Sequence, residues 1–123
     1  MSEVIYAETR NASILGPGLG HSRATSIHAD VRGAQQVSVY ARSAVKAEDI
    51  KRVIYFGGGT GEGNPGGSDT YAPLCEDTFG QTEHLWTSVP VYGPMIRVEV
   101  SCQQTATVVD ITIYAVRDAQ AYP

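Results

Sequence analysis

The segment GGGTGEGNPGGSDT, residues 57–70, has the most distinctive residue pattern in the sequence, because half of it is glycine. It contains a G-x-G-x-x-G spacing at Gly61, Gly63 and Gly66, directly after the apolar run RVIYF. In dinucleotide-binding proteins a helix begins at such glycines and points its amide groups at the pyrophosphate. Here Asn-Pro-Gly-Gly-Ser follows, which predicts no helix, and the Gly-Lys-Ser/Thr of a phosphate loop is missing. The pattern therefore favours a long connection between strands over a nucleotide site.

The same segment offers oxygen atoms that could attract calcium, from Glu62, Asn64 and Asp69. Their spacing matches neither the twelve-residue EF-hand loop nor the glycine-aspartate repeat of calcium-binding β-helices. Long connections of this kind are uncommon in compact domains unless they contact something. We therefore expect this segment to touch a partner and to carry no catalysis.

Residues that could bind a metal or act as a nucleophile are few. His28 and Asp30 are two positions apart, so they share one side of a strand, but a metal would need a third ligand such as His84, and no spacing supports that. Cys75 has no identifiable base, and there is no G-x-S-x-G motif. Cys75 and Cys102 are interpreted as two thiols, with a single bridge left open. We expect no enzyme activity, no cofactor and no metal.

Aromatic residues suggest a different kind of site. Tyr40 and Tyr114 fall on the polar sides of their segments, and Trp86 is the single tryptophan. Outward aromatic rings can stack on sugars or anchor a protein interface. They can equally cover one sheet of a two-layer core, so both interpretations stay open.

Charge and composition exclude two classes of partner. The net charge is −4, and the nine Lys and Arg residues form no run, whereas nucleic-acid binding needs a basic face. No window approaches the ~18 apolar residues of a membrane span. The N-terminus does not resemble a cleaved signal, so we expect the protein to be made and used in a cytosol, or exported without one.

The elements that must position these residues are strands. Alternation of apolar and polar residues predicts them, and the segments with this pattern are residues 24–31, 36–43, 52–56, 84–91, 95–102 and 107–116. The expected inward residues are Ile27, Ala29, Val31, Val37, Val39, Ala41, Ile96, Val98, Val100, Cys102, Val109, Ile111, Ile113 and Ala115. The first two segments are interpreted as a hairpin, and residues 44–51 as one helical turn.

This pattern predicts an all-β fold. No amphipathic segment is long enough for the crossover helices of a parallel sheet, so we expect an antiparallel β-sandwich, jelly-roll-like, with six to eight strands. The predicted organisation is an irregular N-terminal arm over 1–23, a β-sandwich domain over 24–118 and a C-terminal tail over 119–123.

Two stretches of this chain resemble a known group of proteins. The run VSVYARSAVKAEDIKRVIYFGG and the later run YGPMIRVEVSCQQTATVVDITIYAVRD resemble the β-sandwich structural proteins of tailed bacteriophages, in particular small capsid cement (decoration) proteins. The matching residues are Val37 to Ser43, Pro94 to Val98 and Ile111 to Val116. The resemblance covers roughly residues 35–118, and the long glycine-rich segment departs from the short turn that is common in such domains.

The resemblance implies a non-enzymatic virion protein. Such a protein would assemble in the host cytoplasm, sit on the capsid surface and bind the major capsid protein, as a homo-oligomer that is expected to be a trimer. It would bind neither nucleic acid nor a membrane. The alternative is a carbohydrate-binding module or a tail or fibre accessory domain. The arm and the glycine-rich segment would supply the partner contacts, and the residues expected to make them are Val4, Ile5, Tyr6, Leu19, Gly58, Glu62, Asn64, Asp69 and Tyr71.

Overall fold

The computed structural model describes residues 2–14, 23–57 and 71–118 of the 123-residue chain. These residues form eight strands: β1 (Ser2–Ile14), β2 (Arg23–Asp30), β3 (Gln36–Ser43), β4 (Ala47–Gly57), β5 (Tyr71–Phe79), β6 (His84–Pro90), β7 (Met95–Cys102) and β8 (Thr107–Asp118). The described ranges hold no helix of the length and apolar character that a bilayer crossing requires.

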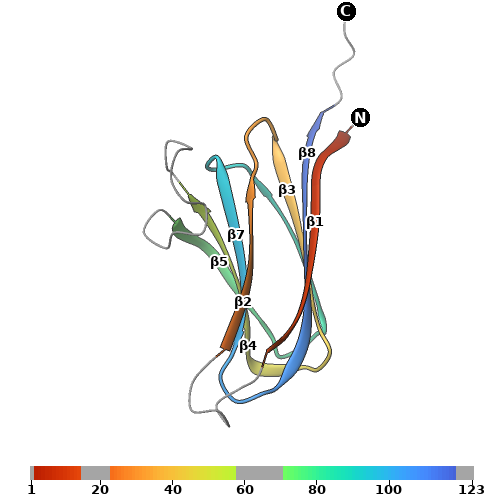
Figure 1. Ribbon diagram of the computed structural model, residues 1–123, viewed down its shortest axis with the longest axis vertical. Coiled ribbons are helices and arrows are strands. Elements are labelled where there is room, and N and C mark those ends of the chain that lie inside the picture. Colours follow the sequence, from red (N-terminus) through yellow and green to blue (C-terminus); the bar gives the residue numbers. More distant parts are fainter. Residues whose placement is uncertain (1, 15–22, 58–70, 119–123) are drawn as a thin grey trace, which may run out of the picture.

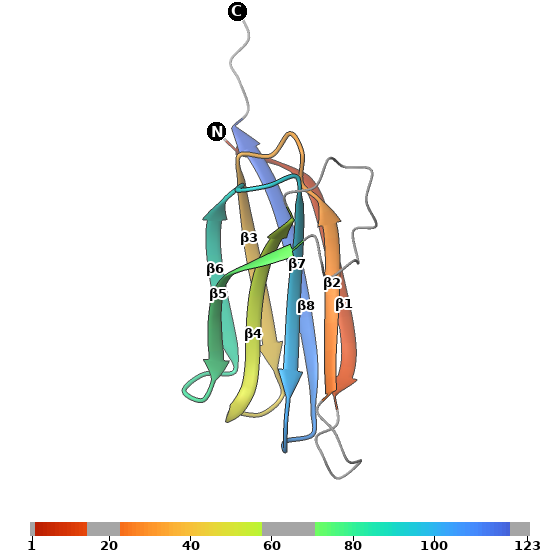
Figure 2. The same cartoon turned by 90° about the vertical axis from the view of Figure 1, so that its left-hand side faces the viewer.

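The strands form two four-stranded antiparallel sheets that pack face to face (Figures 1 and 2). We call the sheet with the order β1-β8-β3-β6 the first sheet, and the sheet with the order β2-β7-β4-β5 the second sheet. Successive strands mostly alternate between the sheets, and the first and last strands pair with each other. This order is the jelly-roll arrangement of two Greek keys, so the predicted antiparallel sandwich is confirmed.

The core lies between the two sheets and is made by alternate residues of each strand. All fourteen residues expected to face inward are buried, which confirms the alternation on β2, β3, β7 and β8. Ile50, Ile54 and Phe79 join them from β4 and β5. The burial of these branched and aromatic side chains on both layers supplies the main stabilisation of a sandwich.

The prediction of an irregular arm over residues 1–23 is wrong for residues 2–14. That segment is β1, which pairs with β8 from Ser2 opposite Asp118 to Ile14 opposite Thr107. A register shift between Val4 and Tyr6 interrupts the strand, and an edge strand with such a bulge shows no clean alternation in its sequence. Residues 15–22 and the expected tail, residues 119–123, lie outside the described residues.

Two further expectations about local structure are also wrong. β2 and β3 do not form a hairpin, because β2 pairs with β7 in the second sheet while β3 pairs with β6 and β8 in the first. Alternation shows which side of a strand is buried but not which strand is its partner. The expected helical turn over 44–51 is not formed, because β4 begins within this segment at Ala47. A register shift between Ala47 and Lys51 breaks the alternation there.

The chain crosses between the sheets at both ends of the sandwich. β1 begins and β8 ends at the same end, where the connections β2–β3 and β6–β7 also lie (Figure 1). Backbone hydrogen bonds join these segments: the amide of Val31 donates to the carbonyl of Pro94 (2.8 Å), and that of Val91 donates to Gln35 (3.2 Å). These hydrogen bonds therefore hold the β2–β3 and β6–β7 connections together at this end of the molecule, and β4 ends beside them.

Candidate functional site

A pocket opens at this end of the second sheet. It has a volume of about 330 Å³ and is lined by Phe56, Gly57, Ala72, Pro73, Leu74 and Tyr92. We call it the end pocket. Its lining comes from the last residues of β4, the first residues of β5 and the β6–β7 connection, so it adjoins both ends of the glycine-rich segment.

The end pocket is unusually apolar for an exposed surface. The Tyr92 side chain is 64% exposed and the Leu74 side chain 40% exposed. The ring of Tyr92 meets the ring of Phe56 edge-on, with centroids 5.7 Å apart. Exposed apolar groups around a concavity mark a contact site for another molecule.

Gly93 lets the pocket walls approach each other. A Cβ atom at this position would lie 2.3 Å from the carbonyl oxygen of Gly57, which is closer than any real contact. The missing side chain therefore allows the β6–β7 connection to pack directly on the end of β4, and this contact positions Tyr92 against Phe56.

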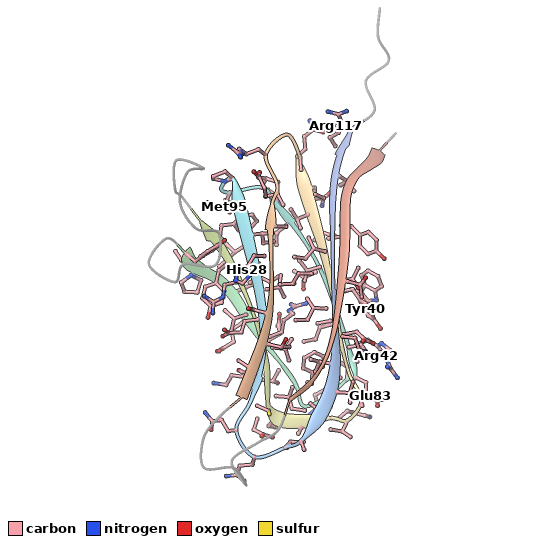
Figure 3. All side chains as sticks on the ribbon, in the orientation of Figure 1. His28, Tyr40, Arg42, Glu83, Met95 and Arg117 are labelled. Atoms are coloured by element: carbon pink, nitrogen blue, oxygen red, sulfur yellow. The ribbon has the colours of Figure 1, made fainter. Side chains whose placement is uncertain are left out.

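A second candidate site lies on the outer face of the first sheet. The Tyr40 and Trp86 rings stack with centroids 4.3 Å apart, and Tyr40 also stacks on His84 at 5.9 Å. We call these three residues the aromatic platform. β6 pairs with β3 so that Tyr40 stands opposite Trp86, and Figure 3 shows Tyr40 on the outer side of the sandwich.

Polar side chains surround the aromatic platform. The hydroxyls of Ser38 and Ser88 lie 2.8 Å apart, one cross-strand row from Tyr40 and Trp86. On the other side, Arg42 forms an ion pair with Asp110, with 3.6 Å between the nitrogen and the oxygen. The platform is therefore a patch of rings set among hydroxyl and paired charged groups.

The three residues considered for a metal do not come together. His28 and Asp30 lie on β2 in the second sheet, whereas His84 lies on β6 in the first sheet. Asp30 accepts hydrogen bonds from the backbone amide and the Nε of Arg32, each 3.0 Å long. Within the described residues, no group of three or more His, Cys, Asp or Glu side chains could hold a metal ion.

The predicted partner contacts fall into three groups. Val4, Ile5 and Tyr6 belong to β1, so they are part of the first sheet and not of a separate arm. Tyr71 begins β5. The remaining contacts lie outside the described residues, and these are Leu19, Gly58, Glu62, Asn64 and Asp69.

Tyr71 lies beside a polar cluster on the second sheet. Its ring is 6.1 Å from that of His28, and its buried hydroxyl has no hydrogen-bond partner in the part of the chain that is described. Burial raises the pKa of this hydroxyl, and the positive charge of Arg97 opposes the rise. Arg97 is in turn fixed by Glu99 at 2.5 Å and by the ring of Tyr55 at 5.0 Å. These contacts hold the arginine in place on the sheet surface.

Neither cysteine forms a disulfide bond. Cys102 is fully buried in the core, and Cys75 on β5 is partly buried and packs against the core cluster. Burial raises the pKa of the Cys75 thiol, although Arg52 lowers it and Asp77 raises it further. A thiol with a raised pKa is a poor nucleophile at neutral pH.

The sequence indicated part of one candidate site, the aromatic platform, and none of the end pocket as a site. It identified Tyr40 and Trp86 as outward aromatic residues but did not bring them together with His84. It missed Phe56, Leu74 and Tyr92; the available signal was Tyr92, a large aromatic residue next to the Gly93-Pro94 turn.

Comparison with known proteins adds no identification. Neither the protein-family models nor the curated proteins searched contain a match to this chain.

Proposed function

We propose that this chain is a non-enzymatic structural protein of a tailed-phage particle, a capsid cement protein that binds the major capsid protein on the outside of the shell. The end pocket is the observation that carries the proposal. It is an apolar pocket with a volume of about 330 Å³, and the strongly exposed Tyr92 forms part of its wall. Exposed tyrosines beside apolar pockets often anchor protein interfaces.

The fold and the charge agree with this assignment. Jelly rolls occur in viral capsid proteins, though also in lectins and enzymes, so the fold alone does not choose between them. The net charge of −4 disfavours nucleic acid as the partner and leaves protein surfaces open. Assembly in the host cytoplasm and a final place on the capsid surface follow from the same proposal.

Oligomerisation strengthens weak contacts of this kind. A single pocket of this size gives modest affinity, but a trimer that engages three shell sites at once gains avidity. The mass of one chain is 13.2 kDa, so light scattering of the purified protein should give about 40 kDa for the threefold symmetric assembly we propose.

The proposed function predicts that the end pocket binds the shell. The purified chain should cosediment with capsids assembled from the major capsid protein of its own phage and prepared without this chain. Leu74→Asp or Tyr92→Ala should weaken that binding roughly tenfold or more, because each removes a central apolar contact. The matched control is Trp86→Ala, which removes an equally exposed aromatic side chain that belongs to the other sheet and does not line the pocket.

Two results would contradict the proposal. One is a wild-type chain that stays in the supernatant at every capsid concentration tested. The other is a loss of binding in Trp86→Ala as large as that in Tyr92→Ala, since the end pocket would then not be the contact.

A further inference from the structure

The aromatic platform is a surface feature that the proposed function does not use. Trp86 is 65% exposed although its ring stacks on Tyr40 at 4.3 Å. β6 is one of the two edge strands of its sheet, and the indole stands beside Tyr40 on the outer face, away from the second sheet. An indole ring that stays in water gives up the hydrophobic stabilisation of burial. A ligand that covered the ring would recover that stabilisation.

The platform is held rigid before any ligand arrives. Tyr40 contacts both of the other rings, and its hydroxyl shares a 2.7 Å hydrogen bond with Nδ1 of His84. The planes of these two rings are 14° apart. A ring system fixed by stacking and a hydrogen bond loses little entropy when it binds.

Hydroxyl groups flank the rings on the same face. The Ser38–Ser88 pair lies beside them, and Thr112, which stands opposite Tyr40 on β8, shares a 3.1 Å contact with the hydroxyl of Thr9. Each hydroxyl can both donate and accept, so the exposed Ser38–Ser88 pair keeps capacity for further hydrogen bonds, whereas Thr112 is only 6% exposed. The ligand is therefore expected to present hydroxyls around a ring-sized apolar surface.

The arginine beside the rings is already neutralised by a carboxylate. Arg42 is paired with Asp110, and Asp110 also accepts a hydrogen bond from the side-chain amide of Asn11. Figure 3 shows Arg42 on the same outer side as Tyr40. A nucleic acid would stack on the rings but would need unpaired cations for its phosphates. A neutral ligand complements rings whose neighbouring arginine is already paired.

We infer that the aromatic platform binds a neutral, β-linked pyranose chain. The C–H face of one sugar ring stacks on Trp86, and its hydroxyls bond to the serine hydroxyls beside the rings. β-Linked glucose and N-acetylglucosamine present flat C–H faces of this kind. The inference stands apart from the proposed capsid role, because it uses a different face of the molecule.

Trp86 is the single tryptophan of the chain, so its fluorescence reports on the platform directly. Titration with cellohexaose or with chitohexaose should change this fluorescence in a saturable way, with a Kd of roughly 0.1–1 mM for a small exposed site. Heparin, a polyanion, should give no saturable change at the same sugar concentration.

Variants followed by calorimetry test the residues. Trp86→Ala should weaken binding at least tenfold, and Tyr40→Phe should weaken it about threefold, because the ring remains but its bond to His84 is lost. Tyr92→Ala is the matched control and should bind as the wild type does. Circular dichroism confirms that each variant folds.

The inference is overturned if neither oligosaccharide gives saturable binding, or if Trp86→Ala binds as tightly as the wild type. It is also overturned if Trp86→Ala dissociates an oligomer of the chain, since the platform would then be an interface between copies. A failure of sugar binding does not bear on cosedimentation with capsids, so the two proposals fail separately, whereas dissociation of an oligomer would also remove the avidity that strengthens capsid binding.

Discussion

Asp49 shows how one side chain can hold a turn. Its carboxylate accepts hydrogen bonds from the backbone amides of Gln103, Gln104 and Thr105 and from the Thr105 hydroxyl, across the β7–β8 connection. Burial raises the pKa of this carboxyl, but the four hydrogen bonds outweigh burial and lower the pKa from 3.8 to about 2. The charged form is therefore the one that the fold stabilises.

The lowered pKa predicts a loss of stability in acid. Because the folded-state pKa lies below the unfolded one, the stabilisation is complete above pH 4 and disappears as the pH falls toward 2. Asp49→Asn should cost about 1–2 kcal/mol at pH 7, a value reduced from the full shift because the carboxylate is partly solvated. The same variant should cost little at pH 2.

Urea unfolding at several pH values measures this effect. The control is Glu48→Gln, at the preceding residue of β4, whose exposed carboxylate accepts a long 3.3 Å hydrogen bond from Thr78. An Asp49→Asn variant with the same stability deficit at pH 2 and pH 7 would show that the carboxylate charge is not what holds the turn.

Arg52 is a buried charge that joins the two sheets. It is 1% exposed, and its guanidinium donates to Asp77 (2.6 Å) on β5 and to Thr87 (2.6 Å) on β6. Its third contact is the carbonyl of Leu85, at 3.3 Å. β5 and β6 are the edge strands on the same side of the sandwich (Figure 2). The hydrogen bonds of Arg52 therefore hold these two edge strands together across the core.

Removing the carboxylate should be costly because it leaves the buried arginine without its counter-charge. Asp77→Ala should destabilise the protein by about 2–3 kcal/mol. Glu76→Ala, which breaks the exposed pair with Lys51 at 3.8 Å, should cost less than about 0.5 kcal/mol. Equal costs in chemical denaturation would contradict the assigned role of Arg52.

At the scale of elements, two glycines in the connections between strands differ in how much space a side chain would find. Gly33 in the β2–β3 connection has φ of +90° and open space around its Cα, whereas Gly93 faces the backbone of Gly57. Gly33→Ala should therefore cost about 1 kcal/mol, from backbone strain alone.

Gly93→Ala should cost more, about 2–3 kcal/mol, because backbone atoms must move to admit the methyl group. It should also weaken capsid binding, since it displaces Tyr92 from Phe56, whereas Gly33→Ala should not. Thermal unfolding together with the cosedimentation assay measures both effects. A Gly93→Ala variant as stable as Gly33→Ala would contradict the close approach.

The sequence predicted the strands better than their partners. Clean alternation identified β3, β7 and β8 and the side of each that is buried, because a sandwich buries one face of every strand. β4 was only partly recognised, because a register shift between Ala47 and Lys51 breaks the alternation over its first residues. β1 was missed because its bulge breaks the pattern, and the order of the strands depends on contacts between distant residues that local patterns do not encode.

At the scale of the whole molecule, the jelly roll separates two surfaces. The end pocket lies where β4, β5 and the β6–β7 connection meet, and the aromatic platform lies on the outer face of the other sheet. The sequence indicated the platform through its outward aromatic residues. Its one signal of the pocket was Tyr92 beside the Gly93-Pro94 turn, and it could not indicate the lining as a whole, because Phe56, Ala72 and Tyr92 are far apart in the chain and only folding brings them together.

The central claim is that this chain binds a capsid shell through the end pocket. The most direct measurement is an electron cryomicroscopy reconstruction of the mature particle of its phage. We expect an eight-stranded sandwich on the outer surface, with Leu74 and Tyr92 against the major capsid protein. A reconstruction in which the sandwich is absent from the shell, or contacts it with the end pocket facing solvent, would contradict the account.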